Sequence, residues 1–291
     1  MREVDSIFEE LRPVLSRLAY RMLGSLADAD DVMQEAYLRW SREPRDEVRV
    51  AQAFLNTTVT RLCIDRRRAI DARKETYVGP WLPEPIVELE APAADAQAEA
   101  AESVSLAMMV VLESLTPIER AAYLLRRVFD YSYAEIAAML EKSEANCRQL
   151  VSRAEEHVRQ RRPRYDATRA EMERITGAFV AACSTGDLGG LVELLANDAV
   201  VYSDGGGKAT AALAPIIGAD RISRFFLGIM RKAPASSCWQ PITVNGLPGL
   251  MATVGDDVAN VMTFEIVDGR IAKCFIIRNP DKLARVRAGE P

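Results

Sequence analysis

Hydrophobic residues recur at helical spacing through the first half of the chain. They fall at positions i, i+3, i+4 and i+7, which is the pattern of a helix that buries one face. Thr116 and Pro117 also have the residue types of a helix cap and a first helical position. The spacing predicts helices over residues 7–23, 28–40, 50–73, 106–114 and 117–128.

The stretch 131–162 has the same periodicity in two parts. Tyr133 to Leu140 predicts a short helix, and Ser143 can cap a longer one that follows. The outer face of this second helix is polar and basic. Two helices joined by a tight turn in this way are typical of a helix-turn-helix that enters the major groove of DNA. A helical hairpin with a solvated charged face is the alternative.

The hydrophobic pattern changes after residue 165. Helices are predicted over 172–182, 188–195 and 220–230. Asp268-Gly269 is a strong hairpin signal, and Asn279 can start a last helix. Helices followed by an antiparallel meander favour an α+β domain in which a curved sheet covers helices. The predicted strands are 197–203, 238–245, 250–254, 258–267 and 270–278.

A segment rich in proline, alanine and glutamate, residues 79–103, separates the helical regions. Such a composition predicts extended chain without a core of its own. Trp81 and Leu82 are exceptions, because an apolar pair in a polar linker needs a surface to dock on. The predicted parts of the chain are 1–78, the linker 79–106, 107–165 and 166–291.

The net charge of −5 over 291 residues at first argues against DNA binding. The acidity lies in the linker 79–106, which has six acidic residues and no basic residue. Basic residues cluster elsewhere, as at Arg66 to Arg68 and Arg159 to Arg162. Local clusters decide phosphate contacts, so the composition is compatible with a nucleic-acid partner.

Composition also limits other kinds of site. The five cysteines are widely spaced and mostly lie among apolar residues, which fits buried thiols in a reducing compartment. His157 is the only histidine, which argues against histidine-based metal sites and catalysis. No apolar run approaches the roughly 20 residues of a membrane span, and the N-terminus does not have the pattern of a signal peptide. We expect a cytoplasmic protein without a metal ion, a cofactor or a membrane contact.

These features together resemble a bacterial extracytoplasmic-function sigma factor of the sigma-70 family over the first 165 residues. DADDVMQEAYLRW, residues 28–40, resembles the region-two helix that docks on the polymerase clamp. AQAFLNTTVTRLCIDRRRA, residues 51–69, resembles the helix that reads and melts the minus-ten promoter element. LTPIERAAYLLRRVFDYSYAEIAAML, residues 115–140, and the helix after it resemble region four, which reads the minus-thirty-five element.

The resemblance implies two all-α sigma domains, a region-two bundle and a region-four helix-turn-helix, in a polymerase subunit that directs promoter-specific initiation. Its implied partners are core RNA polymerase, through the clamp and the flap, and promoter DNA, both as duplex and as melted non-template strand. The acidic face of 28–40 is expected to bind the polymerase through Asp31, Gln34, Glu35 and Leu38.

The resemblance also implies two sets of DNA contacts. Capture of unpaired bases needs stacking and base-edge contacts, and the loop 41–49 is the expected place of a base pocket. The minus-ten contacts are expected from Asn56, Thr60, Arg61, Arg66, Arg67 and Arg68, on a helix face that lies mostly outward. The minus-thirty-five contacts are expected from Glu144, Asn146, Arg148, Gln149, Ser152 and Arg153.

One position departs from the family pattern. Many helix-turn-helix turns of the family have glycine where this chain has Glu141. A left-handed conformation there costs a non-glycine residue roughly 1–2 kcal/mol. Either the turn differs or the strain is tolerated.

Residues 166–291 resemble a SnoaL-like domain of the nuclear-transport-factor-2-like superfamily, a curved antiparallel sheet on helices. A subgroup of sigma factors carries this extension with three short motifs, and it is thought to act in cis in place of a separate anti-sigma factor. We expect the extension to pack on region two and the linker and to regulate the chain. The motifs are Trp81-Leu82-Pro83-Glu84-Pro85, Asp204-Gly205-Gly206-Gly207-Lys208 and Asn279-Pro280-Asp281-Lys282-Leu283. As simpler alternatives, the second motif is a tight turn and the third a helix start.

Other functions stay open on the residues alone. SnoaL-like folds include enzymes that use a carboxylate base and an oxyanion donor, for which Tyr202, Asp204, Asp256 and Asp257 are the candidates. No second acid–base partner is evident, so we expect no catalytic residue. A pocket for an unidentified small ligand suits the fold better. A dimeric helix-turn-helix regulator is the alternative to a sigma factor.

Overall fold

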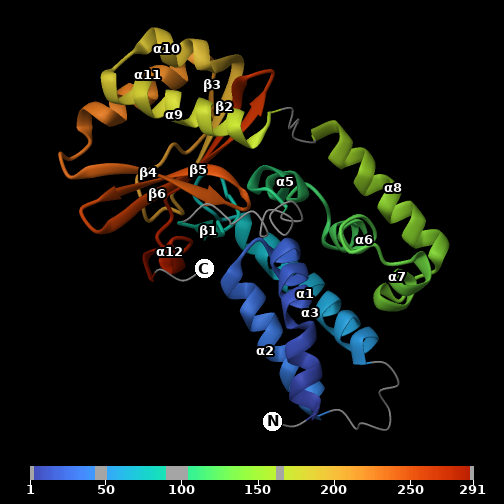
Figure 1. The fold of residues 1–291 in the computed structure, drawn as a ribbon. Coiled ribbons are helices and arrows are strands. Elements are labelled where there is room, and N and C mark those ends of the chain that lie inside the picture. Colours follow the sequence, from blue (N-terminus) through green and yellow to red (C-terminus); the bar gives the residue numbers. More distant parts are fainter. Residues whose placement is uncertain (1–2, 43–50, 90–103, 162–166, 289–291) are drawn as a thin grey trace. The chain divides into compact units, whose positions relative to one another are not determined.

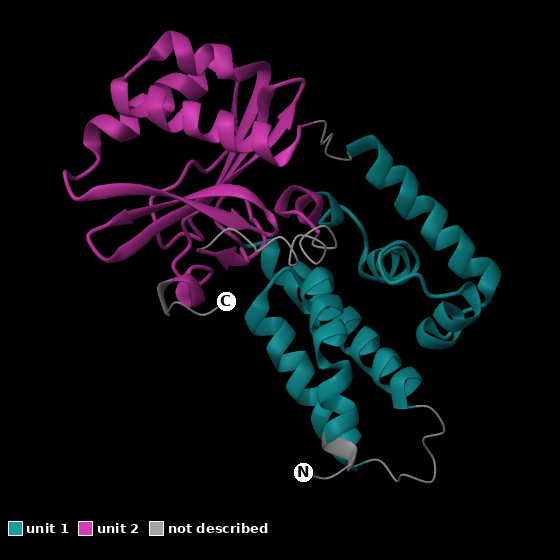
Figure 2. Ribbon diagram, viewed as in Figure 1, with its two compact units in different colours: residues 1–76, 111–162 teal, residues 77–110, 163–291 magenta. Residues whose placement is uncertain are grey.

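The computed structural model describes residues 3–42, 51–89, 104–161 and 167–288. The chain forms two compact units, each built from two separate segments (Figure 2). Residues 1–76 and 111–162 form the first unit, and residues 77–110 and 163–291 form the second. The helix α5 (Leu106–Leu112) carries the chain from the second unit back to the first.

The first unit is helical, as its apolar periodicity predicts. Its helices are α1 (Glu3–Leu23), α2 (Leu26–Arg42), α3 (Ala51–Lys74), α6 (Pro117–Arg127), α7 (Tyr133–Leu140) and α8 (Glu144–Arg161) (Figure 1). The first three pack together around buried residues such as Leu15, Val32 and Leu55. The last three pack on one another, and α6 and α7 also contact α3. Residues 43–49 of the loop expected to hold a base pocket lie outside the described residues.

Side-chain caps encoded in the sequence define the ends of these helices. Thr116 and Ser132 each form a capping box at the start of α6 and α7. The Ser143 hydroxyl accepts a hydrogen bond from the Asn146 amide at the start of α8 (3.2 Å). Glu141 ends α7 in the left-handed conformation, with φ 52° and ψ 48°. The turn therefore has the geometry for which glycine is usual and tolerates the cost of a side chain.

A buried cluster of charges joins α3 to α6. Glu113 accepts hydrogen bonds from Arg67 (2.8 and 2.6 Å) and from Arg120 (2.6 Å), and it also pairs with Lys74. Arg67 is 1% exposed and Arg120 is fully buried. Burial by itself raises the pKa of Glu113, but the charges of Arg120 and Arg67 hold that pKa well below its usual range. The same burial lowers the pKa of Lys74 to about 8.

The second unit is built on a seven-stranded sheet with the order β1-β4-β5-β6-β7-β2-β3. Neighbouring strands are antiparallel except β2 and β7, which are parallel. Asp268 and Gly269 have positive φ and turn β6 into β7, so the predicted hairpin is confirmed. The strands are β1 (Val87–Glu88), β2 (Leu195–Asp204), β3 (Ile216–Ile217), β4 (Ser237–Val244), β5 (Leu247–Val254), β6 (Asp257–Val267) and β7 (Arg270–Ile277).

Apolar side chains form separate cores on the two faces of this sheet. Helices α9 (Arg169–Thr185), α10 (Leu188–Leu194) and α11 (Ala219–Lys232) cover one face (Figure 1). The other core contains Leu82, Val87 and Leu106. Both ends of the segment 77–110 are therefore buried in the second unit.

Two local predictions are wrong. Asn279 does not start the last helix, because α12 (Ala284–Ala288) begins later and Asn279 Oδ1 accepts from the Asp281 amide in a turn (3.1 Å). Strand β5 begins before the predicted residue 250 and includes Pro248 and Gly249, because its pairing with β4 extends to the Asn245–Gly246 turn.

The prediction of buried thiols holds for four of the five cysteines, and Cys238 is exposed. Among the described helices, none has the length and apolar character needed to cross a membrane. Within the same part of the chain, no three His, Cys, Asp or Glu side chains gather as metal ligands would.

Replacement of the central carboxylate, Glu113→Gln, is expected to destabilise the first unit by about 3 kcal/mol or more. It leaves two buried guanidinium groups without their counter-charge. The measurement is urea unfolding of the full chain. The matched control is Glu9→Gln, which breaks an exposed pair with Arg12 and should cost at most about 1 kcal/mol.

The pH dependence has a defined sign. The folded-state pKa of Glu113 lies below the usual value of 4.5, so its stabilising contribution is present above that pH and is lost as the pH falls below it. The difference between wild type and Glu113→Gln should therefore shrink in acid. Equal costs for Glu113→Gln and Glu9→Gln would contradict this account of the cluster.

Candidate nucleic-acid interface and motif cluster

The outer face of α8 is polar and exposed. Its buried side carries Cys147, Val151, Ala154 and Val158, at the spacing predicted from the sequence. Arg148 is oriented by Glu144 (2.7 Å) and by the ring of Tyr133, whose centroid lies 4.9 Å from the guanidinium carbon. The six residues expected to contact the minus-thirty-five duplex are all exposed: Glu144, Asn146, Arg148, Gln149, Ser152 and Arg153.

A second exposed face lies on α2. Asp31, Gln34, Glu35 and Leu38, the residues expected to bind polymerase, are all exposed, while Val32, Met33 and Ala36 are buried. Leu38 is half exposed. This face combines carboxylates, an amide and one apolar side chain, a composition suited to a basic partner surface.

Residues of α3 expected to contact the minus-ten element divide into two groups. Arg61, Arg66 and Arg68 keep part of their side chains exposed. The expectation of a face that lies mostly outward is wrong for the other three, Asn56, Thr60 and Arg67, which are buried. Arg67 belongs to the Glu113 cluster, and Asn56 forms a hydrogen bond with the Tyr131 hydroxyl.

The two exposed arginines that begin the basic run are held by protein acceptors. Arg61 donates to the carbonyl oxygens of Met139 (3.1 Å) and Ala138 (3.4 Å) at the end of α7, and it pairs with Glu141 (2.9 Å). These contacts lie at the turn in which Glu141 adopts the left-handed conformation. Arg66 bridges Asp28 (2.6 Å) and Asp31 (2.7 Å) on α2.

The three short motifs converge in the second unit on the carboxylate of Asp204. This carboxylate is fully buried. Its Oδ2 accepts hydrogen bonds from the Leu82 amide (2.8 Å) and from Lys282 Nζ (2.6 Å), and its Oδ1 accepts from the Tyr77 hydroxyl (2.6 Å). One residue from each motif therefore meets the others at a single charge.

Aromatic rings complete the surroundings of the Lys282 ammonium. Its Nζ lies 4.1 Å from the centroid of the Trp81 ring and 5.1 Å from that of Tyr77, and it also donates to the Leu82 carbonyl oxygen (2.5 Å). The rings and the carboxylate stabilise the same cation. Trp81 and Leu82 thus dock as the sequence predicts, and the surface they dock on is in the C-terminal half of the chain.

The glycines of the second motif allow the close approach of its neighbours. A Cβ on Gly206 would lie 2.4 Å from Asn279 Nδ2 and 2.9 Å from the Tyr77 hydroxyl, and the residue has φ +60°. The second and third motifs also meet at the surface, where Lys208 pairs with Asp281 (2.5 Å). Pro83, Glu84, Pro85 and Leu283 of the first and third motifs are also buried.

Tyr77 is the member of the cluster that sequence reasoning missed. Its hydroxyl donates to Asp204 and accepts from Asn279 Nδ2 (2.8 Å). Burial and the hydrogen bond to Asp204 raise the pKa of Tyr77 above its usual value. Its position just before the proline-rich segment was the one signal in the sequence. Nothing local in the sequence connects Tyr77 to Asp204, which lies far along the chain.

The residues considered for catalysis have the following surroundings. Asp204 is engaged by three donors, and Tyr202 stacks on Phe275 with ring centroids 5.7 Å apart. Asp256, in the turn between β5 and β6, and Asp257, the first residue of β6, are exposed.

Comparisons with known proteins identify the chain. The family models for Sigma-70 region 2 and Sigma-70 region 4 match residues 7–73 and 105–158. The ECF RNA polymerase sigma factor SigJ of Mycobacterium tuberculosis is 39% identical over 289 residues, which is 95% of this chain and 92% of SigJ. The chain belongs to the ECF RNA polymerase sigma factors.

One further relative and one solved structure agree with this assignment. The probable ECF sigma factor SigI of the same organism is 29% identical and covers 98% of this chain and 96% of its own. A crystal structure of M. tuberculosis SigJ aligns with a TM-score of 0.75 at 35% identity and covers 98% of this chain and 99% of that chain. The predicted fold, two helical sigma domains and a C-terminal α+β cone, is confirmed.

The sigma regions map directly onto the described elements. Region 2 is α1 to α3, and region 4 is α5 to α8. As a sigma factor, the protein has core RNA polymerase and promoter DNA as its partners. The identity of each contact residue stays a prediction.

Removal of the central charge, Asp204→Asn, is expected to destabilise the second unit by about 3–5 kcal/mol, because Lys282 is then buried without a counter-charge. Unfolding of the full chain in urea measures the effect. Asp281→Asn is the matched control: it removes an exposed partner of Lys208 and should cost less than about 1 kcal/mol. Similar costs for the two variants would show that Asp204 is not the anchor.

Proposed function

We propose that this sigma factor binds the polymerase clamp through the exposed face of α2 and the flap through region 4. In the same proposal α3 engages the minus-ten element and its melted non-template strand, and α8 reads the minus-thirty-five duplex. The C-terminal unit regulates these activities in cis and does not catalyse a reaction. The observation that carries the regulatory part is the burial of both ends of segment 77–110 in the C-terminal unit.

Exposure and charge support the two outer interfaces. The α2 face offers Asp31 and Glu35 beside the exposed Leu38, which suits a partner surface with basic and apolar groups. The α8 face offers Arg148, Gln149 and Arg153. Arginine and glutamine make bidentate contacts with guanine and adenine, worth about 1–3 kcal/mol of discrimination each.

Minus-ten recognition requires a rearrangement within the first unit. Arg61 is bonded to the end of α7, and Asn56 and Thr60 are buried in the same unit. These side chains become available to DNA only when α7 moves away from α3. We infer that the described arrangement is a resting state and that polymerase binding favours separation of the two regions.

The path of the chain supports regulation in cis. After α3 the chain enters the second unit at residue 77 and returns to the first unit at residue 111. Leu82 and Val87 at one end, and Leu106 and Ala107 at the other, share one core with β4 to β7. The C-terminal unit therefore fixes both ends of the connection between regions 2 and 4, which limits how far the regions can separate.

Two alternatives have less support. A SnoaL-like enzyme would need a free acid–base group, and Asp204 is already engaged by three donors. A helix-turn-helix repressor would not need the region-2 helices that match the sigma-70 family.

Reconstitution with core RNA polymerase tests the proposal. Leu38→Ser should weaken holoenzyme formation about tenfold through loss of an interface contact, whereas Leu213→Ser, at a leucine that is exposed in the second unit, should not. Arg153→Ala should leave holoenzyme formation intact and lower run-off transcription from a cognate promoter roughly tenfold. Arg12→Ala, in an exposed pair on α1, is its control.

Each outcome against the proposal has a separate meaning. Normal holoenzyme formation by Leu38→Ser would remove the α2 face from the polymerase interface. Full transcription by Arg153→Ala would remove α8 from promoter recognition. Transcription by Asp204→Asn that equals wild type under conditions where the second unit stays folded would contradict regulation through the anchored segment.

A further inference from the structure

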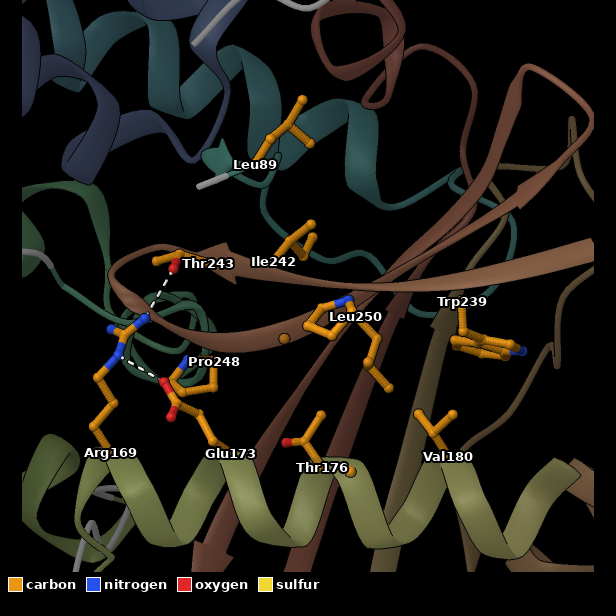
Figure 3. Close-up of a pocket in the computed structure, with 13 residues that line it drawn as sticks. Leu89, Arg169, Glu173, Thr176, Val180, Trp239, Ile242, Thr243, Pro248 and Leu250 are labelled. Atoms are coloured by element: carbon orange, nitrogen blue, oxygen red, sulfur yellow. Dashed lines mark hydrogen bonds and ion pairs between the residues drawn. The ribbon is translucent and has the colours of Figure 1, made fainter. Parts of the chain in front are cut away.

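A cavity of about 520 Å³ lies beside α9 in the second unit, between this helix and strands β4 and β5 (Figure 3). Its volume is within the range of about 300–1,000 Å³ that is usual for small-molecule sites. Most of its wall is apolar, with Val180 and Trp239 at one end and Arg169 at the other (Figure 3). The apolar lining also includes Leu89, Pro241, Ile242, Pro248 and Leu250.

Thr176 places an unsatisfied polar group in this wall. Its side chain extends from α9 toward the strands (Figure 3), the residue is 5% exposed, and its Oγ1 has no hydrogen-bond partner among the described residues. A buried hydroxyl without a partner costs free energy. The oxygen atom itself has almost no accessible surface, so a ligand oxygen would accept a hydrogen bond from this group, and remove that cost, after a change of the Thr176 rotamer.

The opposite end of the cavity is polar and electrically balanced. The Arg169 guanidinium donates to Glu173 Oε1 (3.0 Å), Thr243 Oγ1 (3.1 Å) and the Gly246 carbonyl oxygen (3.3 Å). A guanidinium has five N–H groups, so these bonds leave N–H groups for a ligand acceptor. Glu173 neutralises the charge of Arg169, and a charged ligand would be buried without compensation.

We propose that this cavity binds an uncharged, mainly apolar ring compound that carries hydrogen-bond-accepting oxygen. The ring system lies against Trp239 and Val180, and its oxygen atoms accept from Thr176 and Arg169. Binding, not chemistry, is the function, because the one carboxylate of the lining, Glu173, is largely exposed and already paired with Arg169.

The site has a direct connection to the anchored segment 77–89. Leu89 lines the cavity and follows β1, whose Glu88 is in register with Thr243 of β4. Thr243 is also the acceptor for Arg169. An occupant therefore contacts the last described residue of the segment that leads toward region 4. This regulatory consequence rests on the proposed regulation in cis, whereas the binding site itself does not.

Fluorescence titration of the full chain tests the site with two uncharged ring probes, prodan and Nile red, and with the anionic probe anilinonaphthalene sulfonate. We expect saturable binding of an uncharged probe at one site per chain. Gly177→Leu should weaken it at least tenfold, because Gly177 lines the cavity and a side chain there meets open space. Thr176→Val, which keeps the shape and removes the hydroxyl, should weaken it several-fold.

The matched control is Gly228→Leu, a helical glycine of α11 that also has open space around it but does not line the cavity. It should bind the probe as wild type does. The proposal is overturned if neither uncharged probe saturates, if Gly177→Leu binds as tightly as wild type, or if the anionic probe occupies the same site more tightly.

Run-off transcription with and without the bound probe separates this proposal from the proposed function. Occupancy should change transcription by wild type and leave Gly177→Leu unaffected. Saturable binding without an effect on transcription would contradict the regulatory link and keep the site. The opposite result is also distinguishable. If Asp204→Asn changes transcription but wild type binds no probe, regulation in cis is kept and the binding site is contradicted.

Discussion

The buried carboxylate of Asp204 determines where the chain goes after region 2. A fully buried carboxylate requires a counter-charge and hydrogen-bond donors, and Asp204 obtains them from Lys282, the Tyr77 hydroxyl and the Leu82 amide. Two of these donors precede it by more than a hundred residues. The interaction therefore makes a segment that follows the region-2 helices part of the C-terminal unit. The three short motifs therefore have one role each in this site: the second supplies the acceptor Asp204, the third supplies the cation Lys282, and the first is the segment that docks.

A second buried carboxylate has a comparable role in the first unit. Glu113 compensates Arg67 of region 2 and Arg120 of region 4. It stands just after the point where the chain leaves the C-terminal unit. A buried ionic site therefore lies at each end of the connection between the DNA-reading regions. Asp204 holds the start of the connection, and Glu113 lies just after its end. Loss of one partner strongly destabilises such sites, which suits a connection that is held in one arrangement.

Much of the fold could be predicted from local sequence. The helices of the first unit, the caps at Thr116 and Ser143 and the hairpin at Asp268–Gly269 all depend on neighbours within a few residues. The burial of Arg67 could not be predicted in this way, because a basic run at a helix end looks solvated until Glu113 is placed beside it. Tyr77 was missed for the same reason: its partners are distant in sequence. The motif positions themselves were found through resemblance, and their shared carboxylate required the three-dimensional structure.

Hydrogen exchange in the full chain tests the central claim most directly, namely that segment 77–89 is an integral part of the C-terminal unit. The Leu82 amide donates to Asp204, and the Ile86 amide donates to Asn245 Oδ1 (3.2 Å). Both amides should exchange as slowly as those of β4 and β5, because they open only when that unit opens. Exchange of residues 77–89 at the rate of an unstructured peptide, with β4 and β5 still protected, would contradict the claim.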